Sequence, residues 1–345
     1  MQFVKCRALA LGASAIVMIA QPTFTYADPV ADFYRDKSID LSIGFGPGGG
    51  FDSYARLLAR HLGNFIPGNP TVVPRNMPGG GGLVAANYLY NVAPRDGQHI
   101  AIFGPFNAME PLFGNTAAKF DPAKFTWIGN MNLEVEGCGV WRTSGIQTLT
   151  DLQNKLARFG SSGKASTTNR STLTLKSLIG AKVQVIQGYR GSRDINVAMQ
   201  RGEVDGMCGI SVSSAIAEWH QDLKNGDMKI IVQLGLKNHP FFGDAANIYD
   251  HIKNESDRRV AEFIFRPNEV GRPIAAPPAL PPERAAALRD AFARTMRDPA
   301  FLADAEKRRL LIDPMPGEEI SQLFTTLQQQ PKAVAERARA IFDAQ

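Results

Sequence analysis

Apolar and polar positions along the chain follow two alternating patterns. Short apolar runs, such as 40–45 and 99–103, have the length of buried strands. The stretch 52–62 instead places its apolar residues at the three- and four-residue spacing of a helix. Strands that alternate with helices in this way predict an α/β protein in which helices cover both faces of mainly parallel sheets.

The same patterns extend over the rest of the chain. The predicted strands are 40–45, 71–73, 99–103, 127–131, 135–141, 183–186, 204–208, 229–234 and 274–276. The predicted helices are 52–62, 83–90, 148–158, 173–178, 194–200, 215–223, 282–296, 299–308, 318–330 and 332–342. The last four helices are rich in alanine and charge, which is typical of helices that pack on the outside of a domain. The polar segment 160–168 is predicted to be a loop.

The first 27 residues have the pattern of a secretory signal peptide. Lys5 and Arg7 precede the uncharged apolar stretch 8–20, and a polar segment ends at Ala27, where cleavage is expected. The alternatives are a membrane anchor and a buried helix, but the stretch is shorter than the roughly 20 residues that span a bilayer. The sequence therefore predicts export to the periplasm.

Composition narrows the class of protein further. The chain has 345 residues, of which 44% are hydrophobic and 21% charged, as in a globular protein of about two domains. The net charge of +5 comes without a dense basic run, so nucleic-acid binding is not expected. Cys138 and Cys208 remain after cleavage, and two interpretations stay open: a disulfide in an oxidising compartment, or two small buried hydrophobic residues.

The strongest local motif is the glycine-rich segment 44–52, which follows a predicted strand and opens a helix. Such a loop lets a ligand approach the backbone, and the N-terminus of the helix favours an anion. Gly44, Gly46 and Gly49 also match a dinucleotide-binding template, but the acidic residue expected about 20 positions later is absent. We therefore expect either an anion-binding loop or a purely structural turn.

Further loops with similar chemistry follow other predicted strands. The glycine run 79–82 and the segment 104–107 lie in the first half of the chain, and the hydroxyl-rich segment 160–168 lies in the second. Loops at the ends of parallel strands gather at one sheet edge, where ligands bind in open α/β folds. Arg190 could hold a carboxylate with two hydrogen bonds, although most single arginines are solvated surface residues.

No catalytic or metal-binding motif stands out. The five histidines do not form a metal-binding pair, no Cys–His cluster exists, and Gly-x-Ser-x-Gly is absent. Glu134 and Glu136 lie two positions apart, but they do not stand out as an acid–base pair. The sequence thus predicts a binding protein with no cofactor and no metal, and not an enzyme.

An ordered series of motifs resembles the extracytoplasmic solute-binding receptors of tripartite tricarboxylate transporters, the Bug-type proteins. The motifs are Phe-x-Pro-Gly-Gly-Gly-x-Asp at 45–52, Ala-Arg-Leu-Leu-Ala at 55–59, Asn-x-Pro-Gly-Gly-Gly-Gly at 76–82, Ala-Pro-x-Asp-Gly at 93–97, Tyr-Arg-Gly-Ser at 189–192, Gly-Glu-Val-Asp at 202–205 and Ala-Pro at 276–277. The resemblance runs from about Ile39 to the end. Two departures are a glycine at Gly46, where a second proline is common, and Arg190, where lysine is frequent.

The resemblance implies a two-lobed type II periplasmic binding protein fold with a ligand cleft between the lobes. Lobe 1 would comprise 28–140 and 264–345, and lobe 2 would comprise 141–263. The ligand would be a small organic carboxylate, with phenylalanines such as Phe45 either lining a pocket for an aromatic or long-chain acid or packing in the core. The partners would be membrane permease subunits, and the receptor would be a monomer. A secreted enzyme and a sensory binding module remain as alternatives.

Motifs and resemblance together give a set of candidate ligand-binding residues. They are Phe45, Gly46, Gly48, Gly49, Gly50, Ser53, Gly80, Gly104, Phe106, Asn107, Ser161, Ser162, Tyr189, Arg190, Gly191 and Ser211. In the closed protein, glycine N–H groups and the helix N-terminus would receive one carboxylate, and the hydroxyls of lobe 2 would cover the rest of the ligand.

Overall fold

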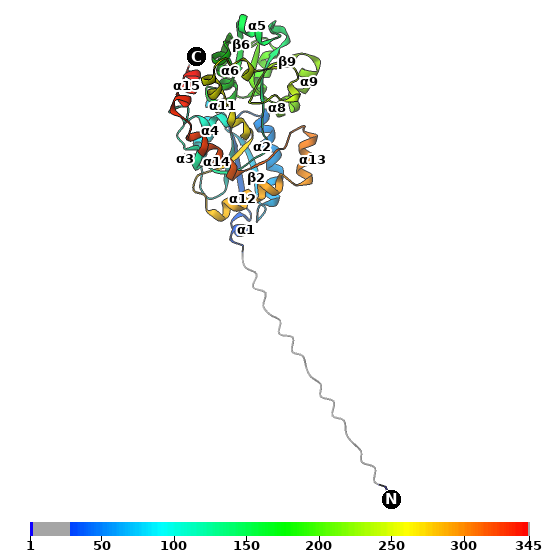
Figure 1. Cartoon of the computed structure of the whole chain (residues 1–345). Helices are drawn as coiled ribbons and strands as arrows, with labels where there is room; N and C mark the ends of the chain where they lie inside the picture. Colours follow the sequence, from blue (N-terminus) through cyan, green and yellow to red (C-terminus); the bar gives the residue numbers. More distant parts are fainter. Residues whose placement is uncertain (3–27, 344–345) are drawn as a thin grey trace.

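The computed structural model describes residues 1–2 and 28–343. Apart from its first two residues, the expected signal peptide lies outside the described residues. Two six-stranded sheets with flanking helices organise the described chain (Figure 1). We call the sheet drawn mainly in blue and orange, with its helices, lobe 1, and the green sheet with its helices lobe 2.

The sheet of lobe 1 has the strand order β12-β4-β11-β3-β1-β2. Its strands are β1 (Ser38–Ile43), β2 (Thr71–Asn76), β3 (His99–Ile102), β4 (Thr126–Asn130), β11 (Pro273–Ala276) and β12 (Met315–Pro316). β1 pairs in parallel with β2 and β3, whereas β11 lies antiparallel between β3 and β4.

The sheet of lobe 2 repeats this plan in the order β10-β9-β5-β8-β6-β7. Its strands are β5 (Glu136–Trp141), β6 (Ala157–Ser161), β7 (Val183–Gln187), β8 (Gly206–Ser211), β9 (Met228–Leu234) and β10 (Ala246–Asn247). β5 lies antiparallel between β8 and β9. Most strands of each sheet run in one direction, as expected, and the exceptions are β11 and β12 in lobe 1 and β5 in lobe 2.

The chain crosses between the sheets twice, between β4 and β5 and again between β10 and β11. The expected limit at 140 falls inside β5, whose residues pair with β8 and β9 from Glu136 onward. The expected limit at 263 falls inside α11 (Glu255–Phe265). The resemblance supplied the expected limits, whereas the sheet pairing places the first crossing at the segment before β5.

Helices flank both sheets, and most follow the predicted pattern. Their bounds are α1 (Pro29–Tyr34), α2 (Gly50–His61), α3 (Leu83–Asn91), α4 (Pro105–Met109), α5 (Leu149–Asn154), α6 (Thr167–Ile179), α7 (Ser192–Gln200), α8 (Val212–Ala217), α9 (His220–Asn225), α10 (Ile248–His251), α11, α12 (Pro282–Thr295), α13 (Pro299–Lys307), α14 (Gly317–Gln328) and α15 (Lys332–Asp343). The helix predicted at 148–158 is wrong at its end, where β6 begins. The helix predicted at 215–223 is divided into α8 and α9.

The last helix, which was expected to belong to lobe 1, lies beside lobe 2 and also reaches lobe 1. α15 packs against α6 and α11, beside the sheet of lobe 2 (Figure 1). The ring of Phe342 on α15 also meets Phe113 edge-on, with centroids 4.7 Å apart. Because Phe113 follows α4 of lobe 1, the C-terminal helix contacts both lobes.

The interior of lobe 2 contains a covalent cross-link. Cys138 on β5 and Cys208 on β8 form a disulfide, and both residues are fully buried. Among residues 1–2 and 28–343, no helix has the length and apolarity needed to cross a membrane.

Candidate functional site

A cavity lies between the two lobes, at the loops that follow the strands. It encloses about 700 Å³ of space free of protein atoms, part of which is open to solvent. Lobe 1 contributes the glycine turn before α2, and lobe 2 contributes the loops before α6 and α7. Both crossing segments also reach it, through Glu134 from the first and Arg272 from the second.

The glycine turn of lobe 1 is held in place by Asp52. The Asp52 carboxylate accepts hydrogen bonds from Gly48 N at 2.8 Å, Arg56 Nε at 2.9 Å and Asn76 Nδ2 at 2.8 Å. Burial raises the pKa of this carboxyl, but these hydrogen bonds outweigh burial and keep the pKa below its usual value. These hydrogen bonds hold the glycine turn in place. The helix α2 begins at Gly50 beside the cavity, and no side chain caps its N-terminus.

The loop of lobe 2 presents hydroxyl groups to the same cavity. Ser166 caps α6 by accepting a hydrogen bond from Asn169 N at 3.2 Å. Thr168 Oγ1 accepts one from Ser162 N at 3.0 Å. Thr167, the first residue of α6, lines the cavity. The N-termini of α2 and α6 therefore approach the cavity from opposite lobes, and both helix ends favour a negatively charged ligand.

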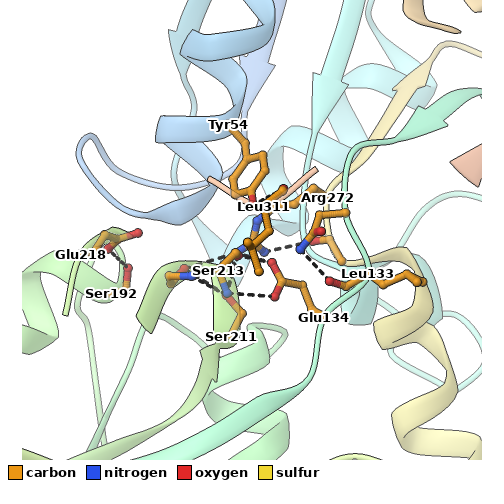
Figure 2. A network of polar contacts seen from close by, with 12 residues as sticks. Tyr54, Leu133, Glu134, Ser192, Ser211, Ser213, Glu218, Arg272 and Leu311 are labelled. Atoms are coloured by element: carbon orange, nitrogen blue, oxygen red, sulfur yellow. Dashed lines mark hydrogen bonds and ion pairs between the residues drawn. The ribbon is translucent and has the colours of Figure 1, made fainter. Parts of the chain in front are cut away.

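Arg272 supplies a buried guanidinium at this cavity. Its side chain is 5% exposed, and Nη2 donates to the Oγ atoms of Ser211 at 2.7 Å and Ser213 at 3.0 Å (Figure 2). The same nitrogen lies 3.2 Å from Glu134 Oε1. The guanidinium carbon lies 4.7 Å from the centre of the Phe51 ring, so the planar cation rests on an aromatic face.

Three glutamates surround this arginine. Glu134 accepts hydrogen bonds from Ser213 N and Ser213 Oγ in addition to its ion pair with Arg272. Glu136 lies on β5 and accepts a hydrogen bond from Ser171 Oγ at 2.7 Å, and burial raises its pKa to about 8. Glu218 lies behind the lining residues, and burial raises its pKa to about 7. Low water access therefore favours the neutral form of the last two carboxyls.

Buried polar atoms without a hydrogen-bond partner gather around the cavity. They are Thr167 Oγ1, Glu218 Oε1, Trp219 Nε1, Asn268 Nδ2, Asn268 Oδ1 and Arg272 Nε. A buried polar atom without a partner costs about 1–3 kcal/mol. A polar ligand that supplies the missing hydrogen-bond partners removes this cost, which favours its binding. Among the described residues, no group of three or more potential metal ligands is found.

Seven of the expected ligand-binding residues line this cavity. They are Phe45, Gly46, Gly49, Gly50, Ser162, Gly191 and Ser211. Gly80, Tyr189 and Arg190 line a neighbouring groove, which shares Phe45 and Ser162 with the cavity. The remaining expected residues lie outside the lining of the cavity: Gly48, Ser53, Gly104, Phe106, Asn107 and Ser161.

Two of the residues outside the lining have a structural role at the contact between the lobes. Asn107 is fully buried, and its amide nitrogen donates to Gly81 O and Ala165 O, each at 3.0 Å. Because Ala165 belongs to lobe 2, this side chain connects the lobes. Phe106 is fully buried in the apolar core. These residues position the loops and do not face the cavity.

Arg190 contacts lobe 1 through its backbone and not through its guanidinium. Its carbonyl oxygen accepts a hydrogen bond from Gly46 N at 3.0 Å. Its side chain is 70% exposed and pairs with Asp194 at 2.8 Å. Arg272, which sequence reasoning missed, provides the guanidinium at the cavity instead.

The glutamates of the site were also missed, although the sequence contained a usable signal. Glu134 and Glu136 flank the start of a predicted strand, and residues two apart on a strand point to the same face. Two acids on one face of a buried strand indicate a functional position. Nothing comparable distinguishes Arg272, since a single arginine before a short apolar run is normally solvated.

Comparison with solved structures identifies the fold. The periplasmic binding protein BugD aligns over 86% of this chain and 97% of its own, with a TM-score of 0.68 and 18% identity. MatC from Rhodopseudomonas palustris with bound malate aligns over 89% and 99%, with a TM-score of 0.68 and 18% identity. A second R. palustris protein, solved with adipate, aligns over 88% and 97%, again with a TM-score of 0.68 and 18% identity.

These similarities confirm the predicted α/β fold with two lobes, that of the type II periplasmic binding proteins. No protein-family model and no curated protein matches the sequence. The lobes of this fold correspond to the two sheets described above, and the cavity lies between them.

Proposed function

We propose that this protein is a periplasmic receptor of the Bug type, which captures a small organic carboxylate for a tripartite tricarboxylate transporter. The cavity between the lobes supports the proposal most directly. Two helix N-termini and the buried guanidinium of Arg272 approach it, and Arg272 Nε has no hydrogen-bond partner. Oriented N–H groups and a guanidinium are the groups that bind carboxylates in water-poor sites.

Closure of the lobes would create this environment. Gly46 N donates to Arg190 O, and Asn107 Nδ2 donates to Ala165 O, so lobe 1 already contacts lobe 2 on two sides of the cavity. A ligand shifts a receptor toward its closed form only through contacts that exist in that form. Arg272 precedes β11 of lobe 1 and donates hydrogen bonds to Ser211 and Ser213 of lobe 2. A ligand bound to Arg272 would therefore make a contact that exists when the two lobes meet.

The resemblance in sequence and the similarity in fold point to the same class of ligand. Two of the structures described above contain malate and adipate. The glycine turns that the resemblance assigns to ligand binding provide Gly46, Gly49 and Gly50 to the lining of the cavity. A receptor releases its ligand unchanged, which separates this proposal from a secreted enzyme with the same fold.

Ligand-dependent stabilisation tests the proposal. Purified mature protein is screened by thermal unfolding against mono-, di- and tricarboxylates, with neutral sugars and divalent metals as controls. We expect one group of carboxylates to raise the Tm, since a ligand at 100 times its Kd adds about 2.7 kcal/mol of stability. Stabilisation by a sugar or a metal alone would contradict the proposed ligand class.

Two further measurements separate the receptor from its alternatives. NMR of the ligand recovered after incubation should show an unchanged compound, whereas an enzyme would yield a product. Deletion of the gene should abolish uptake of that carboxylate by cells, whereas a sensory binding module would alter gene expression without reducing uptake.

A further inference from the structure

The cavity between the lobes contains more acidic groups than a site for a simple carboxylate needs. Glu134 and Glu136 line it, and Glu218 lies directly behind Gly50, Ser192 and Ser214, which also line it. Among the described residues of the lining, Arg272 is the one cation. Arg193 lies outside the lining, where it packs against Gly48.

The charge of Arg272 is already matched by one of these acids. Arg272 Nη2 lies 3.2 Å from Glu134 Oε1, and the two side chains are 5% and 3% exposed. Ser213 supplies further donors to the same carboxylate, through its backbone N–H and its hydroxyl. Glu134 therefore acts as the internal partner of Arg272, and the remaining acids need another partner if they are to be ionised.

Glu136 is the remaining acid that faces the cavity. It is 3% exposed on β5, and one hydrogen bond holds it, from Ser171 Oγ to Oε2 at 2.7 Å. Among the described residues, its Oε1 atom has no donor. Burial raises the pKa of this carboxyl, and the nearby Glu134 raises it further. A positively charged donor on the cavity side would therefore favour the ionised form of Glu136.

Glu218 adds a second acceptor without a partner. Its Oε2 atom accepts a hydrogen bond from Ser192 Oγ at 3.4 Å, and its Oε1 atom is buried with no hydrogen bond. Both amide atoms of Asn268 are also buried without a partner. A ligand that consists of carboxylates on a hydrocarbon chain offers only acceptors, so it would leave Asn268 Oδ1 without a donor and could meet Glu136 and Glu218 only in their protonated forms.

We propose that the ligand is an amino carboxylate, whose protonated amino group binds Glu136 while its carboxylate binds the N-terminus of α2 and Arg272. This inference rests on the proposed function and names the subclass of carboxylate. An ammonium group carries three donors, and its charge offsets the excess of acid in a site with little water. A second ligand carboxylate at the same position would instead meet the negative charge of Glu134 and would require a protonated Glu136.

Matched ligand pairs test the inference by isothermal titration calorimetry. Each pair differs only by the amino group: aspartate and succinate, glutamate and glutarate, and phenylalanine and 3-phenylpropionate. In the pair that binds, we expect the amino member to bind at least about tenfold more tightly, because it retains a buried charged hydrogen bond. Equal or tighter binding of the member without the amino group, or tightest binding of a hydroxy analogue such as malate, would overturn the inference and leave the proposed carboxylate receptor intact.

The variant Glu136→Gln tests whether Glu136 causes the tighter binding of the amino member of a pair. Glutamine has the same shape without the charge, so the preference for the amino member should fall to about twofold or less. Glu203→Gln is the matched control, because Glu203 carries the same carboxyl group on the surface of lobe 2, with its side chain 52% exposed. The Glu203→Gln variant should bind the amino member as much more tightly than its partner as the unsubstituted protein does. A preference that persists unchanged in Glu136→Gln would contradict the assignment.

Proton linkage gives an independent readout in the unsubstituted protein. With an ammonium beside it, Glu136 is ionised in the complex, whereas without one burial keeps this carboxyl protonated in the complex. Titrations at pH 7 in buffers of different ionisation enthalpy should therefore show that the two members of a pair differ by close to one proton. Equal proton uptake would count against the inference. Failure of every carboxylate to bind would instead contradict the proposed function itself.

Discussion

The Nη2 atom of Arg272 lies 2.7 Å from the Oγ atom of Ser211. Arg272 directly precedes β11 in the sheet of lobe 1, and Ser211 ends β8 in the sheet of lobe 2. The contact therefore joins the lobes at the segment where the chain returns to lobe 1. Figure 2 shows Arg272, Glu134 and the serines of lobe 2 in one network of polar contacts. Its guanidinium thus belongs both to the contact between the lobes and to the cavity.

Replacing Arg272 with lysine should weaken carboxylate binding. Lysine keeps the positive charge beside Glu134, so the fold should persist, but one ammonium cannot reproduce a guanidinium that serves several acceptors at once. We expect the affinity for the best carboxylate of the ligand screen to fall about 10- to 100-fold, the equivalent of one or two charged hydrogen bonds. Calorimetric titration of Arg272→Lys measures this loss.

Arg190→Lys is the matched control, since it makes the same change at an arginine outside the cavity. The side chain of Arg190 is 70% exposed and pairs with Asp194, and such surface pairs contribute about 0–1 kcal/mol. Affinity should stay within about twofold of the unsubstituted value. A large loss in Arg190→Lys with none in Arg272→Lys would show that the carboxylate binds in the neighbouring groove.

Replacing Gly50 with alanine should hinder closure of the lobes. A Cβ atom at this position would lie 2.4 Å from Ser214 Oγ, closer than atoms in contact can lie, and 3.0 Å from Arg272 Nη2, which is a tight contact. Because Gly50 is the first residue of α2, alanine is compatible with its backbone, and the stability of the open form should be retained. We expect ligand affinity to fall at least about tenfold. Small-angle scattering should show no compaction on addition of ligand.

The double variant Gly50→Ala with Ser214→Ala separates steric hindrance from other effects of alanine. Removal of the Ser214 hydroxyl deletes the atom nearest to the added methyl group. The double variant should therefore recover most of the affinity lost in Gly50→Ala and regain compaction. A double variant as weak as Gly50→Ala would mean that the contact with α8 does not limit closure.

The sequence predicted the helices and strands whose own apolar pattern matches the structure that they form. The strand at 40–45 overlaps β1, because a short apolar run followed by glycines has the length and the flanking turn of a buried strand. β6 was missed because Arg158 and Gly160 interrupt its apolar pattern, and its place follows from pairing with β7 and β8. Pairing between strands distant in sequence is not contained in a local pattern.

In the candidate site, too, a local motif predicted some residues, whereas tertiary packing alone places the others. Gly49 and Gly50 were predicted from the glycine turn itself, since that motif requires close backbone contact. Arg272 and Glu136 were not, because a charged residue in a sequence normally lies in water. The folded chain brings them together from distant segments and excludes the water, so their role depends on tertiary packing alone.

The disulfide between Cys138 and Cys208 should contribute strongly to stability. It closes a loop across a sequence separation of 70 residues within the sheet of lobe 2. Loop closure of this size restricts the unfolded chain by about 4 kcal/mol. Urea unfolding of the double variant Cys138→Ala with Cys208→Ala should show a loss of this order. The oxidised protein should show no free thiol at either position, and detection of two free thiols would contradict the bridge.

Stability of the ligand-free protein should fall as the pH rises from about 5 to 8. Burial raises the pKa of Glu136 to about 8, despite the hydrogen bond from Ser171 and with Glu134 and Arg272 nearby. In the unfolded chain the same carboxyl has its ordinary pKa near 4.5. Between these values the folded protein holds a proton that the unfolded chain has lost, so raising the pH favours unfolding.

Urea unfolding at pH 5, 6, 7 and 8 measures this dependence. For one proton the slope approaches about 1.4 kcal/mol per pH unit, and Glu218, whose pKa burial raises to about 7, adds to it in the lower part of the range. Glu136→Gln should flatten the slope and stabilise the protein at pH 8, because the amide needs no proton to stay neutral. Glu203→Gln, with its exposed side chain, should leave the slope unchanged. A slope that is equally steep in Glu136→Gln would show that this carboxyl is already ionised in the ligand-free protein, with the lobes open and water at β5.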